Sequence, residues 1–95
     1  MRLAKKNALI TGVAGDIGRA AALRFAAEGA TLILADIDPE GGQQTLDALG
    51  EQAGNSIFLQ ADLTSEAEIV ALFEKVRQHV DSLDILVNIA ARHIV

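Results

Sequence analysis

The sequence predicts an α/β fold in which a doubly wound parallel sheet of four strands is covered by three helices. The first observation is that short apolar runs alternate with segments of helical periodicity along the 95 residues. This alternation is typical of parallel strands joined by right-handed crossover helices. The second observation is a turn with three glycines between the first apolar run and the first helix. Together they predict one domain, residues 1–95, with the strand order 3-2-1-4.

The expected elements are short and have recognisable ends. The strands cover about residues 7–11, 31–35, 56–60 and 84–88, and the first two helices cover about residues 16–28 and 39–49. Continuous apolar strands indicate burial on both faces of the sheet. Asp38 and Pro39 are a typical cap and first residue for the second helix, although Gly41 and Gly42 weaken its first turn. Ser65 begins a capping box that opens the third helix.

The core is expected to be aliphatic, since the chain has three Phe, no Tyr and no Trp. Ile17 is expected to point beneath the first helix into the core, with Leu23 and Phe25 as larger packing groups. The alanines expected to bring this helix close to the sheet are Ala20, Ala21, Ala26 and Ala27. The apolar face expected on the third helix consists of Ile69, Leu72, Phe73, Val76 and Val80.

Composition and charge narrow the classes of function. The net charge of −5 argues against a nucleic-acid partner, because proteins that bind nucleic acids present a basic face. The sequence has no cysteine, which excludes disulfides and thiolate chemistry and fits a reducing compartment. No apolar run approaches the roughly 20 residues of a membrane-spanning helix, and residues 1–6 lack the apolar stretch of a signal peptide. We therefore expect a cytoplasmic protein with no nucleic-acid or membrane partner.

The glycine-rich turn, TGVAGDIG at residues 11–18, has the spacing G-x-x-G-x-x-G at Gly12, Gly15 and Gly18. The first N–H groups of the helix that follows have no intrahelical partner, and the helix dipole adds partial positive charge there. Glycines let the backbone turn tightly and let a pyrophosphate approach it closely. The turn therefore predicts a phosphate-binding site, with a tight turn that binds no ligand as the alternative.

Polar side chains end the other strands at the same edge of the sheet. A carboxylate at Asp36 can accept both hydroxyls of an adenosine ribose and would repel a 2′-phosphate, which favours NAD over NADP. Asp62 could accept from an adenine amino group. The alternatives are a loop aspartate at position 36 and an Asx turn at position 62. The amide of Asn88 could tie neighbouring strand ends together, or Asn88 could line the cofactor cleft through its backbone. We expect it chiefly to satisfy local backbone groups.

Neither histidine is expected to be catalytic, and no metal site is expected. His79 is expected at the surface near the end of the third helix, where a basic group is favourable. His93 follows the last strand near the expected cleft, but one isolated histidine is not a base with an orienting partner. The two histidines are far apart in the sequence and no carboxylate pair brackets them.

Four segments, taken in order, resemble the short-chain dehydrogenase/reductase family, whose cofactor domain is Rossmann-like. They are residues 11–18, 35–36, 61–63 and 84–91, and they extend over essentially the whole chain. The resemblance implies that the glycine turn binds pyrophosphate and adenosine, that Asp36 binds the ribose, and that Asp62 contacts adenine. The implied NAD-binding residues are Gly12, Gly15, Asp16, Ile17, Gly18, Asp36, Ile37, Asp62, Leu63, Asn88 and Ala90. The positions that carry basic residues in NADP-binding members are Gly15 and Ile37 here.

Three departures from the family pattern matter. Asp16 replaces the usual middle glycine and places a carboxylate near the phosphates, and Ala91 stands where the family prefers glycine. The third departure is larger, because the family's catalytic tyrosine, lysine and serine lie further downstream and this sequence contains no tyrosine. The resemblance therefore implies a truncated, N-terminal cofactor-binding half of an NAD-dependent oxidoreductase that acts on an alcohol or a carbonyl. This chain alone is predicted to be inactive.

Two alternative functions remain open on the sequence alone. One is a non-catalytic NAD-binding module, and the other is an inactive truncated fragment that acts through a partner chain. Nothing in the sequence after residues 84–88 supplies a further strand, so an apolar edge at 85–87 is left to be covered. Such an edge predicts self-association or a partner chain.

Overall fold

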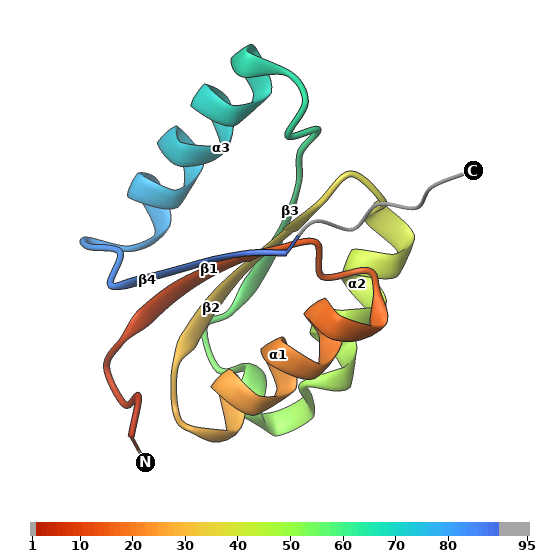
Figure 1. The fold of residues 1–95 in the computed structure, drawn as a ribbon. Coiled ribbons are helices and arrows are strands. Elements are labelled where there is room, and N and C mark those ends of the chain that lie inside the picture. Colours follow the sequence, from red (N-terminus) through yellow and green to blue (C-terminus); the bar gives the residue numbers. More distant parts are fainter. Residues whose placement is uncertain (1, 90–95) are drawn as a thin grey trace.

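Strands and helices alternate throughout residues 2–89, which are the residues described by a computed structural model of the chain. The elements are β1 (Asn7–Thr11), α1 (Asp16–Ala27), β2 (Thr31–Asp36), α2 (Pro39–Ala48), a 3₁₀ helix (Gly50–Ala53), β3 (Ile57–Gln60), α3 (Glu66–His79) and β4 (Ile85–Asn88). The four strands form one parallel sheet in the order β3-β2-β1-β4. Helices α1 and α2 cover one face and α3 covers the other (Figure 1). The predicted fold class and strand order are confirmed.

The two central strands, β1 and β2, supply both cores. Successive side chains of a strand point to opposite faces, so Ala8 and Ile10 of β1 pack with α1, whereas Leu9 packs with α3. The register continues this division into β2, where Leu32 pairs with Ala8 and shares its core. Because helices cover both faces, β1 and β2 are buried from their second residues onward, as their continuous hydrophobicity predicts.

Helix α1 approaches the sheet along a stripe of small residues, Gly18, Ala22 and Ala26. Ile17 lies beside this stripe and is 74% exposed, so its predicted place in the core is wrong. A helix that packs through glycine and alanine lies close to the sheet and leaves no room beneath it for a larger side chain. Phe25 packs at the edge of the core, as expected. The other expected packing residues that are exposed instead are Ala20, Leu23 and Ala27.

Helix α2 begins as the sequence predicts. The carboxylate of Asp38 accepts hydrogen bonds from the N–H groups of Glu40 and Gly41, both at 3.1 Å, and Pro39 follows the cap. Gly42 lies against β3, where a Cβ atom would overlap the ring of Phe58. The glycine that weakens the first turn of this helix is therefore what allows the helix to pack close to the sheet.

Helix α3 buries Leu72 and Val76 against the sheet, and the side chain of Ser65 caps it by accepting the N–H of Glu68 at 3.3 Å. A capping box also requires the side chain of Glu68 to accept the N–H of Ser65, and this half of the prediction is wrong. The carboxylate of Glu68 instead accepts the N–H of Asp62 at 2.7 Å and so holds the loop that precedes the helix.

The helices within residues 2–89 include none with the length and apolar character that a membrane span requires.

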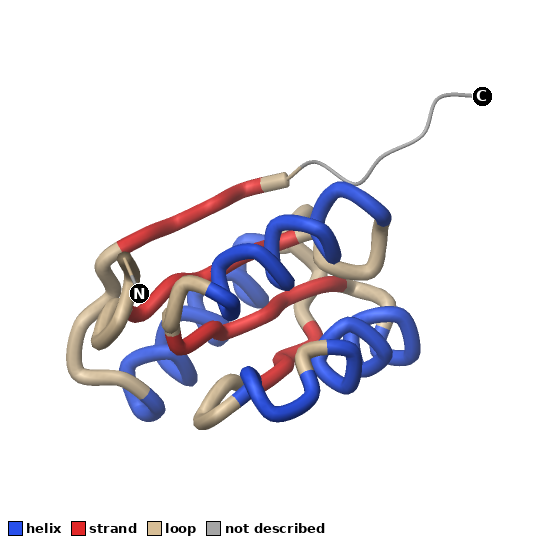
Figure 2. Tube along the Cα trace, turned by 90° about the horizontal axis from the view of Figure 1, so that it is seen from below, coloured by secondary structure: helices blue, strands red, loops and turns tan. Residues whose placement is uncertain are grey.

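Strand β4 forms one edge of the described sheet and β3 forms the other, and β1 is the only strand partner of β4 among residues 2–89 (Figure 2). Leu86, in the middle of this strand, is 56% exposed. An apolar cleft of about 190 Å³ lies beside it on the α3 face, with Phe73 and Leu72 in its lining. The described chain thus presents both an unpaired strand edge and apolar surface next to it.

Candidate nucleotide-binding site

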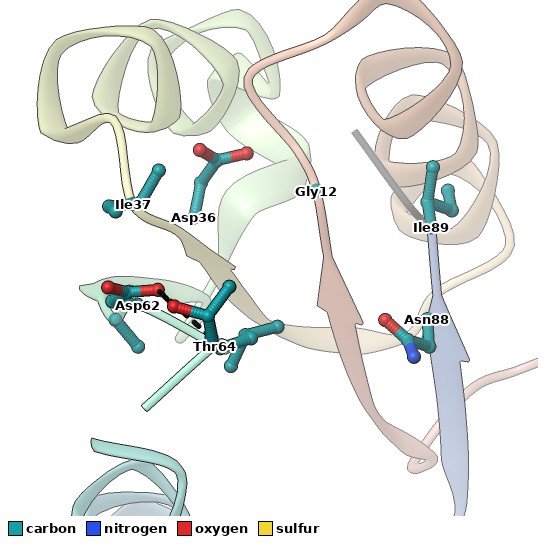
Figure 3. A pocket seen from close by; sticks show the side chains of 9 residues that line it. Gly12, Asp36, Ile37, Asp62, Thr64, Asn88 and Ile89 are labelled. Carbon is teal, nitrogen blue, oxygen red and sulfur yellow. Dashed lines mark hydrogen bonds between the residues drawn. The ribbon is translucent and has the colours of Figure 1, made fainter. Parts of the chain in front are cut away.

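A cleft of about 310 Å³ lies at the carboxyl ends of the strands (Figure 3). In an open α/β sheet this is the edge where ligands bind, at the point where the strand order reverses. The cleft is lined by Gly12, Asp36, Ile37, Ala61, Asp62, Leu63, Thr64, Asn88 and Ile89. The residues shared with the sequence prediction are Gly12, Asp36, Ile37, Asp62, Leu63 and Asn88.

The three glycines of the turn have different physical reasons for being glycine. Gly12 has φ +76°, a conformation that strains residues with a Cβ atom, and that Cβ would overlap the backbone oxygen of Ile89. A Cβ at Gly18 would overlap the backbone of Gly12, so α1 can approach the turn only through this glycine. Gly15 is different, because no atom of residues 2–89 beyond its two chain neighbours lies within 4 Å of the position of its Cβ. The described chain itself does not need a glycine at that position.

The amino end of α1 begins in this open space. Gly15 is the N-cap residue and makes no side-chain hydrogen bond to the helix. The first intrahelical bond runs from the N–H of Arg19 to the Gly15 oxygen at 2.9 Å. The earlier N–H groups of such a helix end are free to bind an anion. Asp16 lies in the same first turn with an exposed carboxylate, and Ile17 is exposed beside it.

Asp36 is held rigidly at the end of β2. Its side chain is only 7% exposed, and its two carboxylate oxygens accept the N–H of Ala14 at 3.0 Å and the N–H of Asp38 at 2.9 Å. Each carboxylate oxygen can accept a second hydrogen bond, so ribose hydroxyls can still be accepted. Asp36 can therefore stabilise the loop after β2, which is the alternative on sequence grounds, and also bind a ligand in the cleft.

Asp62 forms the Asx turn that the sequence left open as an alternative. Its Oδ1 accepts the N–H of Thr64 at 2.9 Å and the hydroxyl of Thr64 at 2.6 Å (Figure 3). These bonds stabilise the carboxylate and hold the pKa of Asp62 below its usual value. Sequence reasoning missed Thr64 as a residue of the cleft, although a threonine two positions after an aspartate is typical of such a turn.

Asn88 ties the ends of two strands together, as one sequence interpretation predicts, and its side chain bonds a distant hydroxyl rather than the expected local backbone groups. Its Oδ1 accepts the hydroxyl of Thr11 at 2.6 Å, and the next residue, Ile89, donates its N–H to the Thr11 oxygen at 3.3 Å. The side-chain bond fixes the position of β4 relative to β1 at the floor of the cleft. Sequence reasoning did not name Thr11 or Ile89 as site residues, because their hydrogen bonds depend on the register between β1 and β4, which the predicted strand order does not give.

Three positions named in the sequence analysis, Ala90, Ala91 and His93, lie outside the described residues. His79 is exposed at the end of α3, as predicted, with its Nε2 atom 2.7 Å from the backbone oxygen of Asn55. Asn55 precedes β3, whereas the cleft lies beyond the carboxyl end of that strand. His79 therefore belongs to the opposite edge of the sheet.

Comparison of the sequence with protein families points to the same kind of site as the geometry of the cleft, one that binds a nucleotide. A family model described as short chain dehydrogenase matches residues 6–95. The chain belongs to the short-chain dehydrogenase family. Members of this family bind nicotinamide dinucleotide cofactors, and the resemblance noted on the glycine turn and the strand ends is confirmed.

Individual short-chain dehydrogenases are similar to the chain over most of its length. The 7alpha-hydroxysteroid dehydrogenase of Escherichia coli is 34% identical over 88 residues, which cover 93% of this chain and 34% of that enzyme. Glucose 1-dehydrogenase 2 of Bacillus subtilis is 33% identical over 87 residues, which cover 90% of this chain and 34% of that enzyme. A crystal structure of a hydroxysteroid dehydrogenase from Escherichia coli matches with a TM-score of 0.85 and 34% identity, over 92% of this chain and 37% of that chain. The chain spans between 12% and 34% of the length of the curated relatives.

Proposed function

We propose that this short-chain dehydrogenase chain is the NAD-binding portion of an oxidoreductase that acts on an alcohol or a carbonyl compound. The observation that carries the proposal is the buried carboxylate of Asp36, which lines the cleft and is bonded to the glycine turn itself. The residues fit the cofactor. The open space at Gly15 and the uncapped end of α1 suit a pyrophosphate, and Asp36 suits the adenosine ribose. Bound NAD would supply the hydride acceptor.

The preference for NAD over NADP follows from the charges around the cleft. The only ionisable side chains in its lining are the carboxylates of Asp36 and Asp62, and neither Lys nor Arg lines it within residues 2–89. The residue after Asp36 is the apolar, exposed Ile37. A 2′-phosphate would be placed against a carboxylate with no cation to neutralise it, which is unfavourable. An unmodified ribose avoids this repulsion.

Calorimetric titration of the purified 95-residue chain with NAD and with NADP tests the proposal. We expect micromolar binding of NAD, and NADP binding weaker by roughly tenfold or more, because like charges placed together cost several kcal/mol. Equal affinity for the two cofactors would contradict the role of Asp36. No heat from either cofactor, in a chain whose NMR spectrum is well dispersed, would contradict nucleotide binding altogether.

We expect this chain alone to have no dehydrogenase activity. The family's proton-transferring tyrosine has no counterpart in a sequence without tyrosine. Hydride transfer to or from an alcohol carbon needs a group that moves the hydroxyl proton. The expected behaviour of the 95 residues is therefore NAD binding without dehydrogenase activity, and the alcohol or carbonyl substrate would be selected by residues outside this chain.

We further propose that the outer edge of β4 associates with a second copy of the chain. Among residues 2–89 no strand pairs with the outer side of β4, which lies beside the exposed Leu86 and the apolar cleft lined by Phe73. Exposed apolar strand edges pair with other strands unless charged residues block them. Pairing β4 with β4 of another copy would cover both edges at once.

Light scattering during size-exclusion chromatography measures this association. We expect the unmodified chain to elute as a dimer or larger species at moderate concentration, and Leu86→Lys to shift it toward the monomer. Val70→Lys is the matched control, since Val70 is also apolar and 55% exposed but lies on α3 and not on the strand edge. A sharp monomer peak for the unmodified chain, or an equal shift in both variants, would contradict pairing through β4.

A further inference from the structure

One peptide group of the glycine turn, between Val13 and Ala14, is held from both sides. Its carbonyl oxygen accepts the hydroxyl of Thr45 in α2 at 2.6 Å. Its N–H donates to Oδ2 of Asp36 at the end of β2 at 3.0 Å. The C=O and N–H of a trans peptide lie in one rigid plane and point in opposite directions within it. Two hydrogen bonds placed this way fix the rotation of that plane.

Thr45 is itself held by a charged partner. Its side chain is completely buried, and its Oγ1 accepts the Nε–H of Arg19 at 2.9 Å. The single hydroxyl proton is then available for Val13, because the other nearby acceptor, the Gly41 oxygen, is farther away at 3.3 Å. A hydrogen bond from a guanidinium polarises a hydroxyl and strengthens the bond that this hydroxyl donates. The order of donation is Arg19 to Thr45 to Val13.

The packing of α2 keeps this arrangement close to the turn. A Cβ at Gly41 would lie 2.8 Å from the Cβ of Ala14, so the first turn of α2 rests directly against the peptide that Thr45 holds. Thr45 lies one helical turn further along the same helix. The turn is therefore supported from behind by α2, while its other side faces the open space at Gly15.

We propose that Thr45 is a positioning residue for nucleotide binding, and that Arg19 acts through it. Together with Asp36 they form what we call the Val13–Ala14 clamp, consisting of Val13, Ala14, Thr45, Arg19 and Asp36. The clamp sets the direction of the backbone that leads into Gly15 and the first N–H groups of α1. Through Asp36 it also couples the ribose-binding carboxylate to the phosphate turn. This inference rests on the proposed NAD-binding function.

The competing explanation is that Thr45 is only a satisfied polar group in the core. A buried hydroxyl elsewhere in the fold separates the two possibilities. Ser56 is buried, and its Oγ accepts the N–H of Leu32 at 2.8 Å near the amino end of β2. Removing either hydroxyl leaves a buried backbone group without its partner and lowers stability. Only the loss of the Thr45 hydroxyl changes the orientation of the phosphate turn.

The experiment compares Thr45→Val, Thr45→Ser and Ser56→Ala in the 95-residue chain. We expect Thr45→Val to weaken NAD binding by roughly tenfold, the scale of one lost hydrogen bond at a site that must hold its geometry. Thr45→Ser keeps the hydroxyl and restores binding to within about twofold of the unmodified chain, well inside the effect of one hydrogen bond. Ser56→Ala lowers the unfolding midpoint and leaves the NAD affinity unchanged.

A second readout needs no nucleotide. Amide hydrogen exchange of Ala14 in the free chain reports whether its bond to Asp36 persists. We expect a protected Ala14 amide in the unmodified chain and in Ser56→Ala, and much faster exchange in Thr45→Val. If Thr45→Val does not fold, Arg19→Met removes the charged donor and keeps the hydroxyl. It should accelerate Ala14 exchange, unlike the control Arg24→Met on the exposed side of α1.

The outcomes are distinguishable. Unchanged NAD affinity and unchanged Ala14 exchange in Thr45→Val would overturn the clamp, as would equal losses of affinity in Thr45→Val and Ser56→Ala. If the unmodified chain bound no NAD, the proposed function would fail on its own. Faster Ala14 exchange in Thr45→Val would then still support the clamp as the device that orients the turn.

Discussion

Gly12→Ala is expected to destabilise the chain severely, whereas Gly15→Ala is expected to preserve the fold and weaken NAD binding. At Gly12 an added methyl group meets two problems, the φ of +76° and an overlap with the backbone oxygen of Ile89. Backbone strain and overpacking of this kind cost about 2–4 kcal/mol together. A chain of this size has a total stability of only ~5–14 kcal/mol. The unfolding midpoint should fall by roughly 10 °C or more.

Gly15→Ala separates binding from folding. Gly15 has φ −85°, which alanine adopts without strain, and no described atom beyond the two neighbouring residues lies within 4 Å of the added carbon. Restricting the unfolded chain should raise stability by up to about 1 kcal/mol, but Gly15 is the N-cap of α1, where alanine is worse than glycine by a similar amount. We therefore expect only a small net change in stability. The methyl group would nevertheless occupy the space in which a pyrophosphate approaches the helix end. We expect NAD affinity to fall by roughly tenfold or more, since an obstructed phosphate loses several hydrogen bonds at once.

Thermal unfolding followed by circular dichroism and NAD titration of both variants check this pair of predictions. The two variants add the same methyl group three residues apart, so they differ only in the surroundings that this group meets. If Gly15→Ala bound NAD as tightly as the unmodified chain, phosphate would not approach the backbone at this residue. If Gly12→Ala unfolded at the same temperature as the unmodified chain, the overlap with Ile89 would be relieved by a shift of β4.

The fold was predictable from the sequence because its local signals agree with one another. The apolar strands, the Asp38–Pro39 helix start and the glycine turn each specify the same alternation of elements, and such consistency is typical of sequences with one stable fold. Ile17 was the exception. Its apolar side chain suggested burial, but α1 packs through the small residues Gly18 and Ala22. Packing distance between a helix and a sheet is a tertiary property that local periodicity does not reveal.

The sequence predicts which strand-end residues form the site, but it does not predict the hydrogen bonds that hold them in place. The sequence predicts Asp36 and Asp62 as ligands for a cofactor, whereas the structure also gives each of them a backbone partner. Thr45 was not singled out at all, since a threonine within a helix carries no motif. Its importance arises only when α2 is placed behind the turn. The difference between Gly12 and Gly15 likewise depends on Ile89, which lies far away in the sequence.

Asp36→Asn is expected to reduce the preference for NAD over NADP by roughly tenfold or more, because it removes the charge that a 2′-phosphate would meet. The change has a second consequence. An amide has one acceptor oxygen, so it can accept from only one of the N–H groups of Ala14 and Asp38 and turns a donor toward the other. The lost hydrogen bond should lower stability by about 1–3 kcal/mol. It should also weaken binding of both cofactors, since Ala14 belongs to the clamp.

The ratio of the two affinities isolates the electrostatic part of this effect. Loosening of the turn weakens NAD and NADP alike and cancels in the ratio, whereas the removed charge affects only the cofactor with the additional phosphate. Asp38→Asn is the matched control, because it removes the same charge two residues away and asparagine caps a helix as well as aspartate does. Titration of both variants with both cofactors decides the matter. An equal change of the ratio in the two variants would mean that selectivity arises from the general negative charge of the region. A change confined to Asp36→Asn would mean that one buried carboxylate both orients the turn and selects the cofactor.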